Sequence, residues 1–126
     1  MLINILLVSL GGALGATLRF TISPQIDKLF NSNFPFGIFV VNIMGCFFIG
    51  LLISLFENKL MLSENLKIFL IIGFLGSLTT FSTFALDNFN LVNQRNFYFL
   101  FLNLILTNFV GLVMVILGIR AIKIFN

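Results

Sequence analysis

The chain has 126 residues, of which 60% are hydrophobic and only 9% are charged. Soluble domains are about one quarter charged, and a water-soluble fold of this size could not bury so much apolar surface. The composition therefore excludes a soluble globular protein, and the length suits a single domain over residues 1–126.

The charged residues divide the chain into four charge-free stretches, at residues 1–18, 29–56, 68–86 and 96–119. A transmembrane helix needs about 20 mostly apolar residues, so each stretch predicts a membrane-spanning helix. The polar segments between them, residues 23–33, 57–67 and 87–95, are expected to be loops. The first stretch lacks the basic start of a cleaved signal peptide, so we interpret it as a permanent helix.

The basic residues favour neither orientation in the membrane. Four spans place Lys59, Lys67, Arg120 and Lys123 on one side, and Arg19, Lys28 and Arg95 on the other. This near balance gives almost no bias under the positive-inside rule. The sequence predicts a chain that inserts with weak orientation or in both directions.

Several kinds of chemistry are excluded by residues that the sequence lacks or places outside the spans. There is no histidine, and Cys46 is the only cysteine, so neither an intrachain disulfide nor a zinc site is plausible. We expect no carboxylate to lie inside a membrane span, which leaves no paired acid and base for catalysis. We therefore expect that the protein is not an enzyme, and proton-coupled transport is disfavoured.

Small residues repeat at intervals of four in the first span. Gly11 and Gly15 have this spacing, and Gly12 and Ala16 repeat it one residue later. Such pairs let two helix backbones approach closely, so helix packing is the favoured interpretation. Arg19 continues the stripe, either as a side chain that reaches the membrane interface or as a fixed positive charge at the mouth of an anion path.

The second span contains one strongly polar side chain, Asn42, followed by Gly45. An asparagine amide offers two N–H donors and one acceptor. It can hold two helices together, worth about 0.6 kcal/mol on average, or it can donate to a permeant ion. From this residue alone, the helix contact is favoured.

The third span is the most informative. Gly73 and Gly76 precede four hydroxyl residues, Thr79, Thr80, Ser82 and Thr83. This pattern predicts either a broken helix whose free carbonyls bind a cation, or a continuous helix whose hydroxyls bond to their own backbone. Phe81 and Phe84 lie three residues apart and share a face, where their positive ring edges could face an anion or simply pack.

The fourth span carries Asn103, Thr107 and Gly111 at intervals of four, with Asn108 beside them. These residues form one polar and small stripe along a helix. A packing seam is the default interpretation, and a polar track along a narrow path is the alternative.

Together these residues resemble the CrcB/Fluc fluoride channels. The matching strings are Gly12-x-x-Gly15 with Arg19, Val41-Asn42-x-x-Gly45, Gly73-Phe74 to Gly76, and Thr79-Thr80-Phe81-Ser82-Thr83-Phe84. The resemblance covers all four spans. It implies an all-α membrane protein of four transmembrane helices with a break in the third. It also implies an antiparallel homodimer of dual topology in the cell inner membrane, giving passive fluoride export that protects against fluoride toxicity.

The resemblance also implies roles for individual residues. Asn42 would donate to fluoride, Phe81 and Phe84 would form an aromatic pathway, and Thr107 would belong to a polar track. The remaining positions are the pathway hydroxyls Thr80, Ser82 and Thr83, the vestibule residue Arg19, and the carbonyls of Gly76 and Thr79 on a structural, non-transported sodium ion. Two positions depart from the pattern: Asn103 replaces a frequent Tyr, and Gly111 replaces a hydroxyl that some members carry.

Two other classes of protein remain as alternatives. A small dual-topology multidrug or cation antiporter has a similar architecture, but it generally needs a carboxylate within the membrane. A non-transporting scaffold would explain the glycines and would leave the hydroxyl and phenylalanine cluster unexplained.

Overall fold

The computed structural model describes residues 1–57 and 63–125, and every element in that part of the chain is helical. The elements are α1 (Leu2–Phe30), α2 (Phe36–Glu57), α3 (Glu64–Lys67), the π-helix η1 (Ile68–Leu75), α4 (Gly76–Leu78), α5 (Phe81–Asn93) and α6 (Phe97–Phe125). Four segments are long and apolar enough to cross a membrane: Leu2–Phe30, Phe36–Glu57, Glu64–Asn93 and Phe97–Ile122. The predicted all-α fold with four spans is confirmed.

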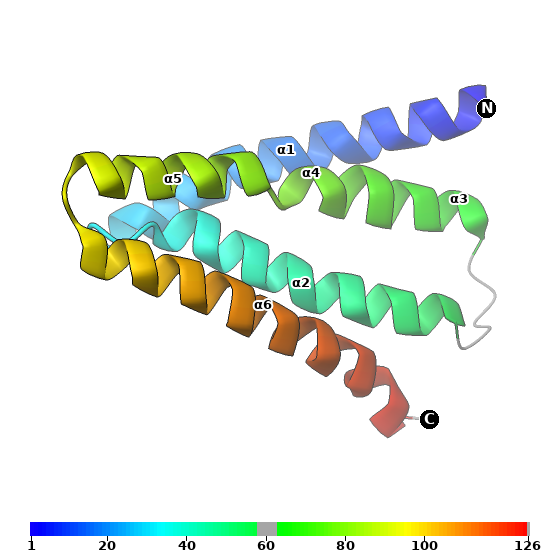
Figure 1. The fold of residues 1–126 in the computed structure, drawn as a ribbon. Coiled ribbons are helices and arrows are strands. Elements are labelled where there is room, and N and C mark those ends of the chain that lie inside the picture. Colours follow the sequence, from blue (N-terminus) through cyan, green and yellow to red (C-terminus); the bar gives the residue numbers. More distant parts are fainter. Residues whose placement is uncertain (58–62, 126) are drawn as a thin grey trace.

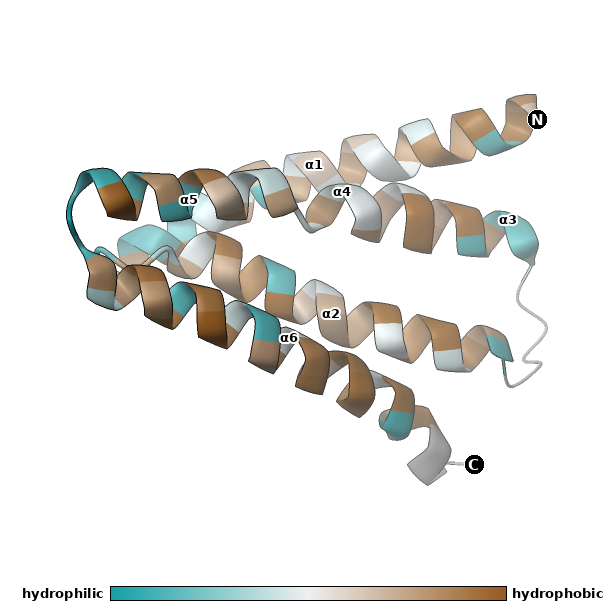
Figure 2. Ribbon diagram, viewed as in Figure 1, coloured by the Kyte–Doolittle hydropathy of each residue, from teal (hydrophilic) through white to brown (hydrophobic). Residues whose placement is uncertain are grey.

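The helices lie side by side in one elongated bundle. Figure 1 shows both termini at the end of the bundle where α2 ends and α3 begins, whereas the α1–α2 and α5–α6 connections lie at the opposite end. The long helices are mainly apolar along their length, with hydrophilic segments concentrated near the connections (Figure 2). This distribution is the one expected for a chain whose helices cross a bilayer.

The helices extend beyond the charge-free stretches, so the predicted loops at residues 23–33 and 87–95 are largely wrong. α1 continues through Pro24 to Phe30 and ends where Asn31 adopts a left-handed conformation, with its N–H bonded to the carbonyl of Asp27. α5 likewise continues to Asn93. Charge marks where a helix leaves hydrocarbon, whereas a helix ends where its backbone hydrogen bonding stops.

Two further sequence predictions change with these boundaries. Asp27 and Asp87 lie inside candidate spans, contrary to the expectation that no carboxylate does. Arg19 lies well within α1 rather than near its end. Of the loop predicted at residues 57–67, residues 58–62 lie outside the described part of the chain, and Glu64–Lys67 is helical.

The glycine stripe of α1 packs closely against another helix, as predicted, and the structure shows that the partner is the third span. A Cβ atom on Gly11 would collide with backbone atoms of Phe69 and Phe74, and one on Gly15 with backbone atoms of Phe74 and Leu78. Two glycines that sequence reasoning overlooked, Gly50 and Gly118, make the same kind of close approach between α2 and α6. Small residues thus set the spacing of both helix pairs.

Candidate functional site

The central feature of the site is a pair of hydrogen bonds between the side-chain amide of Asn42 on α2 and the backbone of Thr80. The N–H of Thr80 donates to Asn42 Oδ1 at 2.9 Å, and Asn42 Nδ2 donates to the carbonyl of Thr80 at 3.1 Å. Asn42 is buried, with 8% of its surface exposed. One amide therefore satisfies both polar backbone groups of a residue that stands outside the helices.

Thr79 and Thr80 separate α4 from α5 with extended backbone conformations. Their ψ angles are 149° and 128°, whereas the flanking residues are helical. Thr80 also caps α5, because its Oγ1 accepts the N–H of Thr83 at 3.3 Å. Opposite this segment, a Cβ atom on Gly45 would collide with the γ-methyl group of Thr79. The glycine therefore allows α2 to lie directly against these two residues.

Arg19 bridges the two sides of the Thr79–Thr80 segment from α1. Its Nε donates to the carbonyl of Ser77 in α4 at 3.1 Å, and its Nη1 donates to Thr83 Oγ1 in α5 at 3.3 Å. The side chain is half-buried. A planar guanidinium with several donors can bond to two acceptors in this way, whereas an ammonium group is a single compact charge.

A pocket of about 460 Å³ lies beside these residues, between α2, the third span and α6. It brings together seven residues predicted from sequence: Asn42, Gly76, Thr79, Thr80, Phe81, Phe84 and Thr107. Ser82 and Thr83 are outside the lining but bond to it, since Thr80 Oγ1 lies 3.1 Å from Ser82 Oγ and 3.4 Å from Thr83 Oγ1. Arg19 is also outside the lining and connects to it through Thr83.

Phe81 and Phe84 supply the aromatic wall of this pocket. Their ring centroids are 5.8 Å apart, with the rings tilted by 45°. The two rings differ in environment, because Phe84 is 7% exposed and Phe81 is 79% exposed. One ring is thus part of the folded chain, and the other projects from it.

Two buried asparagines and the half-buried Thr107 form a chain of hydrogen bonds that connects α5 to the pocket through α6. Asn103 Nδ2 donates to Asn88 Oδ1 at 2.9 Å, and Thr107 Oγ1 donates to Asn103 Oδ1 at 3.0 Å. The seam between α6 and α2 continues at Gly111, where a Cβ atom would lie 3.4 Å from Cys46 Sγ. Sequence reasoning missed Asn88, because it assigned residues 87–95 to a loop. The available signal was spacing, since Asn88 lies four residues after Phe84 and therefore on the same face of a helix.

Comparison with known proteins places the chain in a family. The family described as "CrcB-like protein, Camphor Resistance (CrcB)" matches residues 6–119. The chain belongs to this family.

Its CrcB relatives have similar lengths. A protein of Azobacteroides pseudotrichonymphae, named fluoride-specific ion channel FluC, is 45% identical over 118 residues, which are 94% of each chain. A protein of the same name from Clostridium novyi is 42% identical over 117 residues, which cover 93% of this chain and 91% of that protein. Another from Vibrio parahaemolyticus is 44% identical over 99 residues, which cover 79% of this chain and 78% of that protein. With its four candidate spans, this CrcB protein is a multi-pass protein of the cell membrane, as the sequence predicted.

Proposed function

We propose that the chain is a fluoride-selective channel that lets fluoride leave the cytoplasm passively and so protects the cell from fluoride toxicity. The observation that carries the proposal is the pocket in which Asn42, Thr107 and two phenylalanine rings meet inside a membrane-spanning bundle. Its relatives, which are named fluoride-specific ion channels, support the same ion. Acidic surroundings generate HF, which enters the cell and dissociates, and the trapped anion then needs a path out.

The chemistry of the pocket suits a small anion that binds water strongly. A pore must replace that water with donors. The amide nitrogen of Asn42 carries two hydrogens, and the bond to Thr80 uses one of them. The second hydrogen is our proposed donor to fluoride. The hydroxyls of Thr80, Ser82, Thr83 and Thr107 and the ring edges of Phe81 and Phe84 provide further weak interactions along the path.

We place a structural, non-transported sodium ion at the carbonyls of Gly76 and Thr79. The N–H of Thr80 would bond to the carbonyl of Gly76 in a continuous helix, and here it bonds to Asn42 instead. The carbonyl of Gly76 is thereby available to a cation, and Thr79 follows it in an extended conformation. Carbonyls at a break in a membrane helix are suitable ligands for sodium. In this proposal the Thr79–Thr80 segment is the break in the third span.

We further propose that two copies assemble as an antiparallel homodimer of dual topology. Two carbonyls from one chain leave a sodium ion incompletely coordinated, and a second copy can supply the rest. The 79% exposure of Phe81 beside the pocket also suits a ring that a partner would cover. The near balance of basic residues on the two sides supports insertion in both directions.

One observation favours the rival function, a small dual-topology cation antiporter. Asp87 lies within a candidate span, and its Oδ2 is buried without a hydrogen-bond partner in the described part of the structure. Buried carboxylates in membrane helices often carry protons in transporters. The antiporter predicts uptake of a cationic dye driven by a pH gradient, whereas the channel predicts none.

Fluoride release from liposomes that contain the purified protein tests the channel. We expect rapid release of fluoride, no release of chloride, and loss of fluoride release after sodium is thoroughly replaced by a large organic cation. Equal rates for the two halides, or no fluoride release, would overturn the function. If fluoride release is unchanged after sodium is removed, the sodium site is wrong and the fluoride channel still stands.

A further inference from the structure

The amide pair Asn88 and Asn103 sets the direction of a hydrogen-bond chain that ends at the pocket. The two residues are 8% and 1% exposed, so water does not compete for these bonds. Asn103 donates to Asn88 and accepts from Thr107, and Thr107 lines the pocket. Each bond fixes the orientation of the next amide, because an asparagine presents a donor on one side and an acceptor on the other.

In this direction the hydroxyl of Thr107 has no proton for an anion. A hydroxyl carries a single hydrogen, and Thr107 donates it to Asn103 Oδ1 at 3.0 Å. Thr107 therefore presents only lone pairs to the pocket, which repel a negative ion. A threonine that assists an anion must point its O–H into the pocket instead.

The chain can be reversed without moving a helix. A half turn of both amides exchanges their N and O atoms, after which Asn88 donates to Asn103 and Asn103 donates to Thr107. The number of hydrogen bonds within the chain is the same in both directions. The reversed direction leaves the Thr107 proton free for the pocket, and an anion beside Thr107 would favour it.

We propose that Asn88 is a positioning residue that acts through Asn103 and lets the Thr107 hydroxyl turn towards fluoride during conduction. This inference rests on the proposed fluoride channel. Asn88 need not touch the ion. In the reversed hydrogen-bond chain its amide N–H donates to Asn103, at the end furthest from the pocket.

Two substitutions of Asn88 distinguish this role from simple packing. Asn88→Asp keeps the oxygen that accepts from Asn103 and loses the amide donor. The hydrogen-bond chain is then held in the direction in which Thr107 donates its hydroxyl hydrogen to Asn103 and has none for the pocket. Asn88→Leu breaks the bond and leaves Asn103 free to turn. We expect Asn88→Asp to lower fluoride release per folded dimer about fivefold to tenfold, the typical effect of one hydrogen bond, and Asn88→Leu to lower it less. A packing role predicts the opposite order, because only Asn88→Leu loses the bond.

The same pair of substitutions is then made in a Thr107→Val background, where no hydroxyl remains to be oriented. We expect the difference between Asn88→Asp and Asn88→Leu to disappear there, which also excludes a general effect of the new charge. Asn93→Asp makes the same change at an exposed position of α5 and should keep wild-type release. If Asn88→Asp does not assemble, Asn103→Asp takes its place. An aspartate at position 103 can only accept from Thr107, so it also keeps the hydroxyl hydrogen of Thr107 away from the pocket.

Equal release from the two Asn88 variants, or a difference that persists with Thr107→Val, would overturn the positioning role while the channel stands. A wild-type protein that releases no fluoride would overturn both the channel and the positioning role of Asn88, because no fluoride would then bind beside the Thr107 hydroxyl.

Discussion

Asn42 forms hydrogen bonds with both backbone polar groups of Thr80. Its amide oxygen accepts the N–H of Thr80, and its amide nitrogen donates to the carbonyl of Thr80. An extended residue within a membrane span needs such partners, since lipid offers none. One side chain on α2 thereby makes the backbone conformation at Thr80 possible and faces the pocket at the same time.

The first prediction concerns this amide. Asn42→Leu removes these two hydrogen bonds from the half-buried Thr80. A backbone group that is fully buried and left unpaired costs about 1–3 kcal/mol. We expect a clearly lower thermal unfolding midpoint in detergent and loss of fluoride release. Asn4→Leu removes an exposed asparagine from α1 and is the matched control. Equal unfolding midpoints for the two variants would show that the Asn42–Thr80 pair contributes nothing to the fold.

A second prediction pairs Gly45 with Thr79. In Gly45→Ala the new methyl group collides with the γ-methyl of Thr79, which forces α2 away from the segment and lowers both stability and fluoride release. Thr79→Ser removes that methyl and keeps the hydroxyl that donates to Leu75 at 2.8 Å. The double variant should therefore recover most of both properties. Additive losses in the double variant would contradict the contact.

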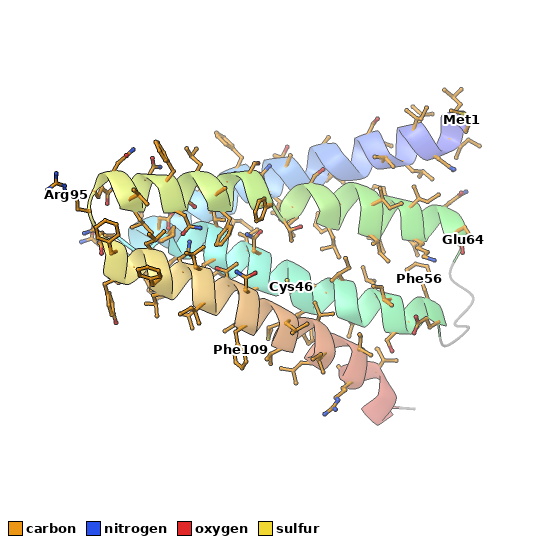
Figure 3. The ribbon with its side chains drawn as sticks, in the orientation of Figure 1. Met1, Cys46, Phe56, Glu64, Arg95 and Phe109 are labelled. Atoms are coloured by element: carbon orange, nitrogen blue, oxygen red, sulfur yellow. The ribbon has the colours of Figure 1, made fainter. Side chains whose placement is uncertain are left out.

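The third prediction tests the bridge made by Arg19. Arg19→Lys keeps the positive charge but cannot reproduce the fork that bonds to Ser77 and Thr83. We expect a lower unfolding midpoint and reduced fluoride release, measured beside Arg95→Lys, which makes the same change at an exposed turn residue (Figure 3). If the two lysine variants behave alike, the role of Arg19 is its charge and not its geometry.

A fourth prediction separates the two phenylalanines of the pocket. Phe84→Ile alters a ring that is buried within one chain and should reduce both the stability of the fold and fluoride release. Phe81→Ile alters a ring that is exposed in the single chain, so it should reduce release with a smaller loss of stability. Phe109, which projects from α6 away from the bundle and is 67% exposed, provides the control Phe109→Ile (Figure 3). Release at the wild-type rate from both pocket variants would remove the aromatic pathway.

The number of spans and most of the pocket could be predicted from sequence, because both depend on local composition. Charge-free stretches locate membrane helices, and polar residues within them mark surfaces that do not face lipid. Asn42, Thr79, Thr80 and Thr107 were identified in this way and line one pocket.

Helix ends and long-range partners could not be predicted in this way. Charges show where hydrocarbon ends, so the loop assigned to residues 87–95 concealed Asn88, whose partner Asn103 lies on the next helix. The two hydrogen bonds between Asn42 and Thr80 join residues 38 positions apart, and no local sequence pattern encodes such a pairing. The bridge from Arg19 to Ser77 and Thr83 depends in the same way on how α1 packs.

The most direct test of the central claim is electrical. The purified protein is placed in a planar bilayer with unequal fluoride concentrations on the two sides, and the reversal potential is measured while chloride and pH are varied. A fluoride-selective channel predicts a reversal potential at the fluoride equilibrium value that changes with neither chloride nor pH. A reversal potential that follows chloride or the proton gradient would contradict the account.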